Sequence, residues 1–163
     1  MMLVDRSGII GDTWAVVDGE EPLPQGPVIL PFDRVASAVG RNQPTGVHLA
    51  NDTDPADVEP YFPDLAIISI DFPSFADGRG FSIGRCLRER GFKGRLRATG
   101  PVIADQFAYL LECGFDEVAV AESVAKRQPA ERWLAQLSKV TLSYQRGREG
   151  RASILDRRRA AQA

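Results

Sequence analysis

Short runs of aliphatic and β-branched residues recur along the chain, separated by stretches with helical periodicity. The runs predict five strands, at residues 28–30, 46–50, 66–71, 95–99 and 116–121. Strands that alternate with helices are typical of a parallel sheet, because a parallel pair needs a long crossover connection. We therefore expect an α/β fold with a mostly parallel sheet of about five strands and βα repeats, either flavodoxin/Rossmann-like or partial-barrel-like.

Capping residues and glycines mark where the intervening helices begin and end. They predict a short helix capped by Asp54 and Pro55, a helix over 83–90 capped by Ser82 and ended by Gly91, a helix opened by Pro101 and closed by Gly114, and a last helix started by Pro129. The third has the clearest apolar stripe, since Ile103, Phe107 and Leu110 share one face.

The two ends of the chain differ from this repeat. Residues 8–18 alternate loosely and predict a short strand or hairpin, and residues 20–27 form a proline-rich polar loop. Beyond Gln145 the sequence is basic and has little to bury. We therefore expect an N-terminal hairpin and loop over 1–27, an α/β domain over 28–145 and a basic flexible tail over 146–163.

Length and composition fit one soluble domain that buries its own core. The chain has 163 residues, of which 44% are hydrophobic and 26% are charged. Its longest aliphatic run, residues 66–70, is far too short to span a bilayer, and its first residues lack the apolar block of a signal peptide. We expect a cytoplasmic protein with no membrane partner.

The net charge of −2 hides an uneven distribution. Residues 77–100 include two acidic side chains, Asp77 and Glu89, and seven basic ones: Arg79, Arg85, Arg88, Arg90, Lys93, Arg95 and Arg97. The segment 146–159 is also basic, so the remainder of the chain is strongly acidic. An acidic chain disfavours general nucleic-acid binding, whereas a local basic cluster favours a site for a small anion.

The anion site is expected in two loops next to the ends of predicted strands. Thr99 and Gly100 run from a strand into the helix opened by Pro101, and free N–H groups at a helix start suit phosphate, sulfate or carboxylate. The glycines on either side of Arg79 permit close backbone approach, and its guanidinium supplies a bidentate fork. The candidate anion-binding residues are Arg79, Gly80, Ser82, Arg85, Arg97, Thr99 and Gly100.

Two carboxylates are candidates for acid–base chemistry. Asp71 lies at the carboxyl end of a predicted strand and Asp77 lies in the loop that follows, where ligands of α/β folds bind. The alternative is an internal ion pair in which Asp71 or Asp77 neutralises Arg97, and the sequence leaves both open. His48 is expected to be a hydrogen-bonded histidine of the core or the sheet edge.

Neither a metal nor a redox cofactor is expected. Cys86 and Cys113 do not form a Cys-x-x-Cys pair, and with the single histidine, His48, they cannot build an ordinary zinc or iron–sulfur site. Both cysteines fall among apolar helix positions and are expected to be buried thiols. The chain has no flavin, haem or nicotinamide signature, and its lone Gly-x-Gly is not a dinucleotide fingerprint.

Several short motifs resemble a bacterial domain family of unknown function. They are Phe75-Ala76-Asp77-Gly78-Arg79-Gly80-Phe81-Ser82, Arg85-x-Leu87-Arg88-x-Arg90, Gly94-x-Leu96-Arg97-Ala98-x-Gly100, Asp105-Gln106, Cys113-Gly114-Phe115-Asp116 and Ser143-Tyr144-Gln145. The resemblance covers residues 28–145. Genes of that family typically lie beside those for assimilatory sulfite reductase and the reductase of activated sulfate, so the resemblance implies a role in sulfur assimilation.

The residues and the resemblance together lead to three hypotheses. The first is an accessory protein of sulfate and sulfite reduction that binds a small oxyanion or a phosphorylated nucleotide and docks on sulfite reductase or a sulfate-activation enzyme. The second is a small enzyme of sulfur metabolism, with Asp71 or Asp77 as acid or base and Arg79 and Arg97 holding an anionic substrate. The third is a homo-oligomer without a ligand, in which the loop around Asp77 and the helix with Asp105 and Gln106 pack against their copies.

Overall fold

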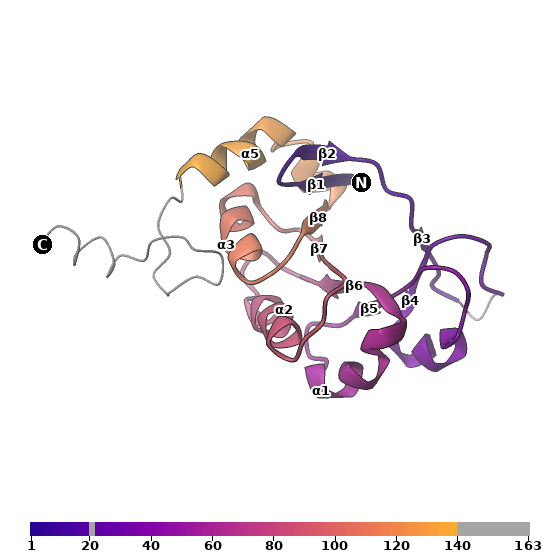
Figure 1. Cartoon of the computed structure of the whole chain (residues 1–163). Coiled ribbons are helices and arrows are strands. Elements are labelled where there is room, and N and C mark those ends of the chain that lie inside the picture. The colour runs from indigo at the N-terminus through magenta and orange to yellow at the C-terminus, as the bar shows by residue number, and fades with distance from the viewer. Residues whose placement is uncertain (20–21, 140–163) are drawn as a thin grey trace, which may run out of the picture.

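Eight strands form one mixed sheet in the computed structural model, which describes residues 1–19 and 22–139 (Figure 1). The strands are β1 (Met2–Asp5), β2 (Gly8–Ile10), β3 (Ala15–Val16), β4 (Val28–Pro31), β5 (Thr45–Leu49), β6 (Leu65–Asp71), β7 (Arg95–Gly100) and β8 (Glu117–Val120). Their order across the sheet is β2-β1-β8-β7-β6-β5-β4-β3. Neighbours from β3 to β8 are parallel, whereas β1 runs antiparallel to both β2 and β8.

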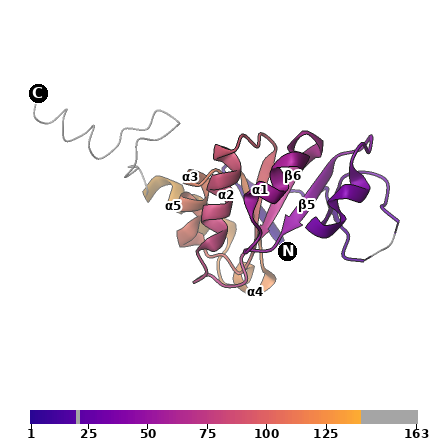
Figure 2. The same ribbon diagram turned by 90° about the horizontal axis from the view of Figure 1, so that it is seen from below.

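Helical segments follow strands β4 to β8. They are η1 (Phe32–Ala38), α1 (Pro55–Val58), η2 (Glu59–Asp64), α2 (Arg79–Glu89), η3 (Ala104–Gln106), α3 (Phe107–Glu112), α4 (Glu122–Ala125) and α5 (Ala130–Lys139). The helices lie outside the curve that the strands follow, and α2, α3 and α5 gather on one side of β5 and β6 in the turned view (Figure 2). Within the described ranges, no helix has the length and apolar character needed to cross a membrane.

The α/β class is confirmed, but the predicted sheet is wrong in size and in kind. The five predicted strands correspond to β4–β8, which lie side by side in chain order without the reversal that defines a Rossmann-like sheet. Strands β1, β2 and β3 join them, and β1 makes the sheet mixed. These three strands are only two to four residues long, too short to show a hydrophobic period. The hairpin expected within residues 8–18 forms earlier, from β1 and β2.

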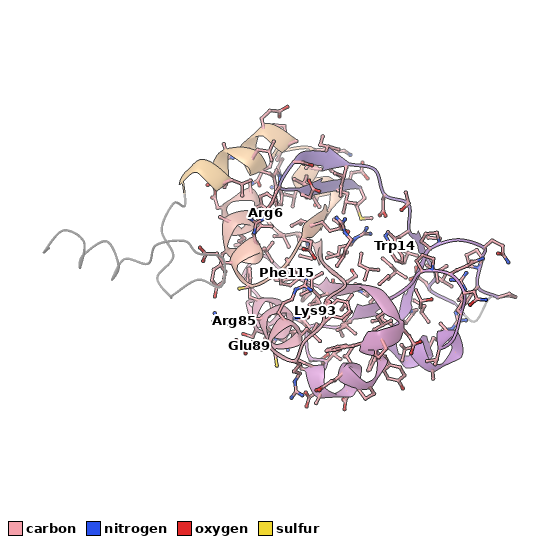
Figure 3. All side chains as sticks on the ribbon, viewed as in Figure 1. Arg6, Trp14, Arg85, Glu89, Lys93 and Phe115 are labelled. Atoms are coloured by element: carbon pink, nitrogen blue, oxygen red, sulfur yellow. The ribbon has the colours of Figure 1, made fainter. Side chains whose placement is uncertain are left out.

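The connection between β2 and β3 forces the sheet to curl. Residues 11–14 alone join these two edge strands, and this strap can span at most roughly 19 Å. A flat sheet of eight strands would hold its edges roughly 34 Å apart. The sheet therefore bends round until the strap, on which Figure 3 labels Trp14, closes the distance between its edges.

The two faces of the curled sheet carry different residues, because side chains alternate along each strand. The outer face packs beneath the helices and contributes to the main apolar core Val47, Leu49, Ile68, Ile70, Leu96, Ala98, Val118 and Val120. The inner face carries a polar row in register across four strands: His48, Ser69, Arg97 and Glu117. Polar groups shielded inside the curl must find partners there, since an unpaired buried polar group is costly.

The start of α2 differs from the prediction. The helix begins at Arg79 with Gly78 as its N-cap residue, and Ser82, the predicted cap, is an exposed residue within the helix. Asp77 Oδ1 accepts the Arg79 N–H at 3.1 Å and so satisfies a free backbone donor one turn before Ser82. The predicted end is confirmed, because Gly91 follows the helix with a φ of +104°.

The helix after β7 also begins later than predicted. Ile103 is extended, and its N–H donates to the Gln106 side-chain oxygen at 3.1 Å, so the first helical turn starts at Ala104 rather than Pro101. The predicted close at Gly114 is confirmed by its φ of +96°. Thr99 and Gly100 therefore do not open a helix, and the helix-start argument for an anion at these two residues does not apply.

Two further helix starts agree with the prediction. Asp54 caps α1 by accepting the Ala56 N–H at 2.9 Å, and Pro55 is the first helical residue. Helix α5 begins at Ala130, directly after Pro129. The predicted basic tail over 146–163 lies outside the described residues.

Candidate functional site

The Asp77 carboxylate, a candidate acid or base, is held by two side chains and a backbone amide. Oδ1 accepts from Nε and the backbone N of Arg79, both at 3.1 Å, and Oδ2 accepts from Nη2 of Arg79 at 2.7 Å. Asn51, in the loop after β5, donates from Nδ2 to Oδ2 at 2.7 Å. The Asp77 side chain is 20% exposed and that of Arg79 is 61% exposed. The carboxylate is thus clamped, while the arginine beside it still faces solvent.

We expect the Asp77 carboxyl to titrate near pH 2. The side-chain and backbone hydrogen bonds from Arg79 favour the ionised form and lower the pKa of Asp77 from 3.8 to about 2. Because the folded pKa is the lower one, the stabilising contribution of ionised Asp77 is complete above about pH 3.8 and is lost as the pH falls toward 2. An NMR titration of the carboxyl carbon measures this pKa directly.

The matched variants for this titration are Arg79→Ala and Arg90→Ala, at opposite ends of α2. Arg79→Ala should return the Asp77 pKa toward 3.8, and Arg90→Ala should leave it unchanged, because Arg90 pairs with Glu59 instead. An Asp77 pKa that stays near 2 in Arg79→Ala would contradict the clamp.

Asp71, the other candidate carboxylate, is half-buried at the carboxyl end of β6 and faces Thr99 on β7. Beside it, a chain of hydrogen bonds crosses three strands: Ser69 Oγ lies 2.7 Å from Thr99 Oγ1 and 3.2 Å from His48 Nδ1. Ser69 is buried, so these bonds satisfy a hydroxyl that water cannot reach. The prediction of a hydrogen-bonded histidine at His48 is confirmed.

Arg97, a candidate for binding an anion, lies inside the curl and is fully engaged by acids. Its side chain is 3% exposed; Nη1 and Nη2 donate to the two oxygens of Asp12 at 2.8 and 3.0 Å, and Nε donates to Glu117 Oε1 at 2.7 Å. Burial lowers the pKa of Arg97, but the bonds to Asp12 and Glu117 outweigh it and raise the pKa overall. Arg97 thus forms an internal ion pair, with Asp12 and Glu117 rather than Asp71 or Asp77.

Two candidate glycines are required by close packing against Phe72. A Cβ on Gly80 would lie 2.5 Å from the Phe72 ring, where α2 meets the sheet. A Cβ on Gly100 would lie 2.2 Å from the Phe72 carbonyl oxygen, and Gly100 also has a φ of +131°. The absence of a side chain at these positions is therefore explained by packing alone.

The other arginines of residues 77–100 also hold carboxylates. The ion pairs of this segment are Arg79 with Asp77, Arg85 with Glu89, Arg88 with Asp116, Arg90 with Glu59, Arg95 with Glu117, and Arg97 with Asp12 and Glu117. Arg85 and Glu89 form an i, i+4 pair on the outer side of α2 (Figure 3). The basic cluster seen in the sequence is thus largely an ion-pair network.

Arg88 has a structural role that the sequence did not indicate. Its guanidinium donates to the carbonyl oxygens of Phe92, Gly94 and Gly114 and to Asp116 Oδ2, at 2.7 to 2.9 Å. These contacts join the end of α2 to the loops that enter β7 and β8. Arg88 therefore ties successive βα units together.

Both cysteines are free thiols. Cys113 is buried and Cys86 is half-buried. Burial raises the pKa of the Cys113 thiol, and a raised pKa leaves less of the reactive thiolate at neutral pH. The prediction of a buried thiol is therefore confirmed for Cys113, whereas Cys86 is only half-buried.

A cavity of about 260 Å³ opens between residues that the sequence analysis did not select. Its lining is Phe75, Ile103, Arg127, Gln128 and Arg132. The signal in the sequence was weak, because Arg127 and Arg132 flank Pro129 at the start of a helix, where basic residues are ordinarily solvated. The loop that carries Phe75 also carries Asp77, although neither Asp77 nor Arg79 lines the cavity.

A family of bacterial proteins of unknown function, DUF934, matches residues 46–155, about two thirds of the chain. The chain belongs to this family. Among curated proteins, none matches it. The resemblance seen in the motifs is therefore confirmed at the level of the DUF934 family.

The DUF934 match begins within β5 and leaves β1–β4 outside. The clamp on Asp77 and all the residues that line the cavity lie inside the matched region. Asp12, which holds Arg97, lies outside it. One half of the buried ion pair thus comes from the part of the chain that precedes the DUF934 region.

Proposed function

We propose that this DUF934 protein is an accessory binding protein of assimilatory sulfate and sulfite reduction, with no redox cofactor of its own. It holds a small oxyanion or a phosphorylated nucleotide and docks on sulfite reductase or a sulfate-activation enzyme. The link to sulfur assimilation is supported by the motifs that run from Phe75 to Gly100. The choice of binding over catalysis is supported by the geometry.

The observation that carries this choice is the clamp on Asp77. A general acid or base needs a pKa near the working pH, and the Arg79 bonds move the pKa of Asp77 away from it, to about 2. Arg79 is largely exposed, so the guanidinium is placed to contact a ligand or a partner while its acid keeps it oriented.

Asp71 supports the second candidate function, a small enzyme of sulfur metabolism. It is half-buried at the carboxyl end of β6, and none of the contacts among the described residues pairs it with a cation. A carboxylate in this position could exchange a proton with a substrate held by Arg79. Asp71→Asn separates the two functions, since it would abolish a reaction and leave binding of a reductase unchanged.

Co-purification tests the proposed function. The tagged full chain, expressed in bacteria grown on sulfate as the sulfur source, should retain sulfite reductase or the reductase of activated sulfate. Raised salt should release the reductase, because the acidic surface of this chain would bind a basic partner. Absence of any reductase, together with no change in melting temperature with sulfate, phosphate or a nucleotide, would contradict the proposal. Self-association in place of a reductase would support the homo-oligomer.

A further inference from the structure

The cavity lies at the carboxyl ends of three adjacent parallel strands. Phe75 belongs to the loop after β6, Ile103 to the loop after β7, and Arg127, Gln128 and Arg132 to the segment after β8. Loops at this end of parallel strands are where α/β folds bind their ligands, because each strand delivers one loop to the same edge. The location alone favours a ligand site.

Hydrogen bonds join the three loops and fix the walls of the cavity. The Gln106 side-chain amide donates to the Phe75 carbonyl oxygen at 2.8 Å, which links the loops after β6 and β7. Gln128 Oε1 accepts the Ala104 N–H at 2.8 Å, and the Gln128 carbonyl oxygen accepts from the buried Trp133 indole at 3.2 Å. A site held in this way is formed before its ligand arrives, which lowers the entropic cost of binding.

The two arginines of the cavity differ from those of residues 77–100. Arg127 donates from Nε to the Ser123 carbonyl oxygen at 3.0 Å, which fixes its guanidinium, and its terminal nitrogens hold no carboxylate among the described residues. No carboxylate of the described chain pairs with Arg132 either, and this side chain is exposed. Two guanidinium groups without a carboxylate partner among the described residues therefore line one cavity. Both have the geometry to bind the oxygens of a phosphate.

The apolar residues of the cavity, Phe75 and Ile103, indicate that the ligand also has an aromatic or apolar part. Phe75 is 58% exposed, which is unusual for a phenylalanine, and Ile103 also lines the cavity. An exposed aromatic ring next to cations suits a base that stacks on the ring while its phosphate meets the arginines. The side-chain oxygen of Gln128 accepts the Ala104 N–H, so its amide nitrogen is the atom that can donate to an acceptor on the base or the sugar.

We infer that this cavity binds a phosphorylated mononucleotide, with the base against Phe75 and the phosphate between Arg127 and Arg132. A volume of about 260 Å³ lies below the usual range of ligand pockets, roughly 300–1,000 Å³, which argues against a ligand as large as a dinucleotide. The inference rests on the proposed binding function and gives that function a site, which is distinct from the Asp77–Arg79 pair.

The test measures binding of AMP, inorganic phosphate and adenosine to the full chain, by calorimetry and by the shift in melting temperature. AMP should bind more tightly than phosphate or adenosine. Arg127→Ala and Arg132→Ala should each weaken AMP about tenfold or more, since each removes a charged hydrogen-bond donor. Phe75→Ala should weaken AMP about tenfold and leave phosphate affinity unchanged.

Lys126→Ala is the matched control. It removes the same charge one residue away, from an exposed side chain that pairs with Glu122 and does not line the cavity. AMP affinity should be unchanged in this variant.

Three outcomes would overturn the inference. AMP binding that survives Arg127→Ala and Arg132→Ala but is lost in Arg79→Ala would place the ligand at the Asp77–Arg79 pair and leave the proposed function standing. No AMP binding by the unaltered chain would exclude a nucleotide, and the proposed function would fail only if no reductase co-purified either. If the unaltered chain binds no AMP and the Arg127→Ala/Arg132→Ala double variant no longer binds the reductase, the occupant of the cavity is an acidic segment of that partner.

Discussion

Replacing Arg97 with alanine is expected to lower the free energy of unfolding by about 3 kcal/mol. The Glu117 side chain is only 2% exposed, and loss of Arg97 removes the donor from its Oε1 while Arg95 still holds Oε2. Asp12 loses both of its bonds to the guanidinium at the same time. The loss of stability is large because the ionised Glu117 carboxylate is shielded from water and would lack a hydrogen-bond donor at Oε1. Equilibrium unfolding in urea, followed by tryptophan fluorescence, measures it.

Arg90→Ala is the appropriate comparison for this measurement. Arg90 also pairs with a glutamate, Glu59, but the two side chains are 38% and 47% exposed, so the variant should unfold nearly as the parent does. Equal stability of Arg97→Ala and Arg90→Ala would show that the inner ion pair does not hold the fold. Arg97 would then regain its place as a candidate for binding an anion.

Gly100→Ala is expected to destabilise the protein by about 2–5 kcal/mol, through two costs that act together. At a φ of +131° an L-residue is strained, and the added Cβ would lie 2.2 Å from the Phe72 carbonyl oxygen. Backbone atoms on both sides make this contact hard to relieve. Because Phe72 follows β6, relief would have to shift β7 relative to β6. The urea midpoint and the melting temperature should both fall.

Gly78→Ala is the control for this effect. Gly78 has an ordinary φ of −88°, and a Cβ built on it meets nothing within 4 Å, so the variant should be close to neutral. If Gly100→Ala is as stable as Gly78→Ala, the backbone of β7 does not approach the Phe72 carbonyl oxygen as closely as described. Binding of AMP should survive in both variants wherever they remain folded, since neither glycine lines the cavity.

Strands β4 to β8 could be predicted because their signal is local. Each is four to seven residues long and contributes buried apolar side chains to one of two apolar clusters, β4 to the smaller one and β5–β8 to the main core. Strands β1 and β3 carry no comparable signal in the sequence. They are extended chiefly because they pair with β8 and β4 at the edges of the parallel strands. An edge that becomes available only in the folded state leaves no pattern in a short sequence.

The same distinction applies to the charged groups. The pair of Arg85 and Glu89 could be predicted, because one helical turn places the two side chains together. The pair of Arg97 and Asp12 could not, because the two residues are 85 positions apart and meet only when the strap crosses the opening of the curl. A basic cluster in the sequence therefore indicated where charge is concentrated and did not indicate how much of it is already neutralised.

The position of β1 also constrains when the molecule can be completed. Met2 of β1 is synthesised well before its partner Val120, which belongs to β8, the last strand of the sheet in chain order. Until β8 has emerged, the N-terminal strand lacks its edge and the strap cannot deliver Asp12 to Arg97. Pairing between segments so distant in sequence is slow, because a long loop must close before any contact compensates for the lost entropy. We therefore expect the inner ion pair to form late, after the βα units have been synthesised and have docked on one another.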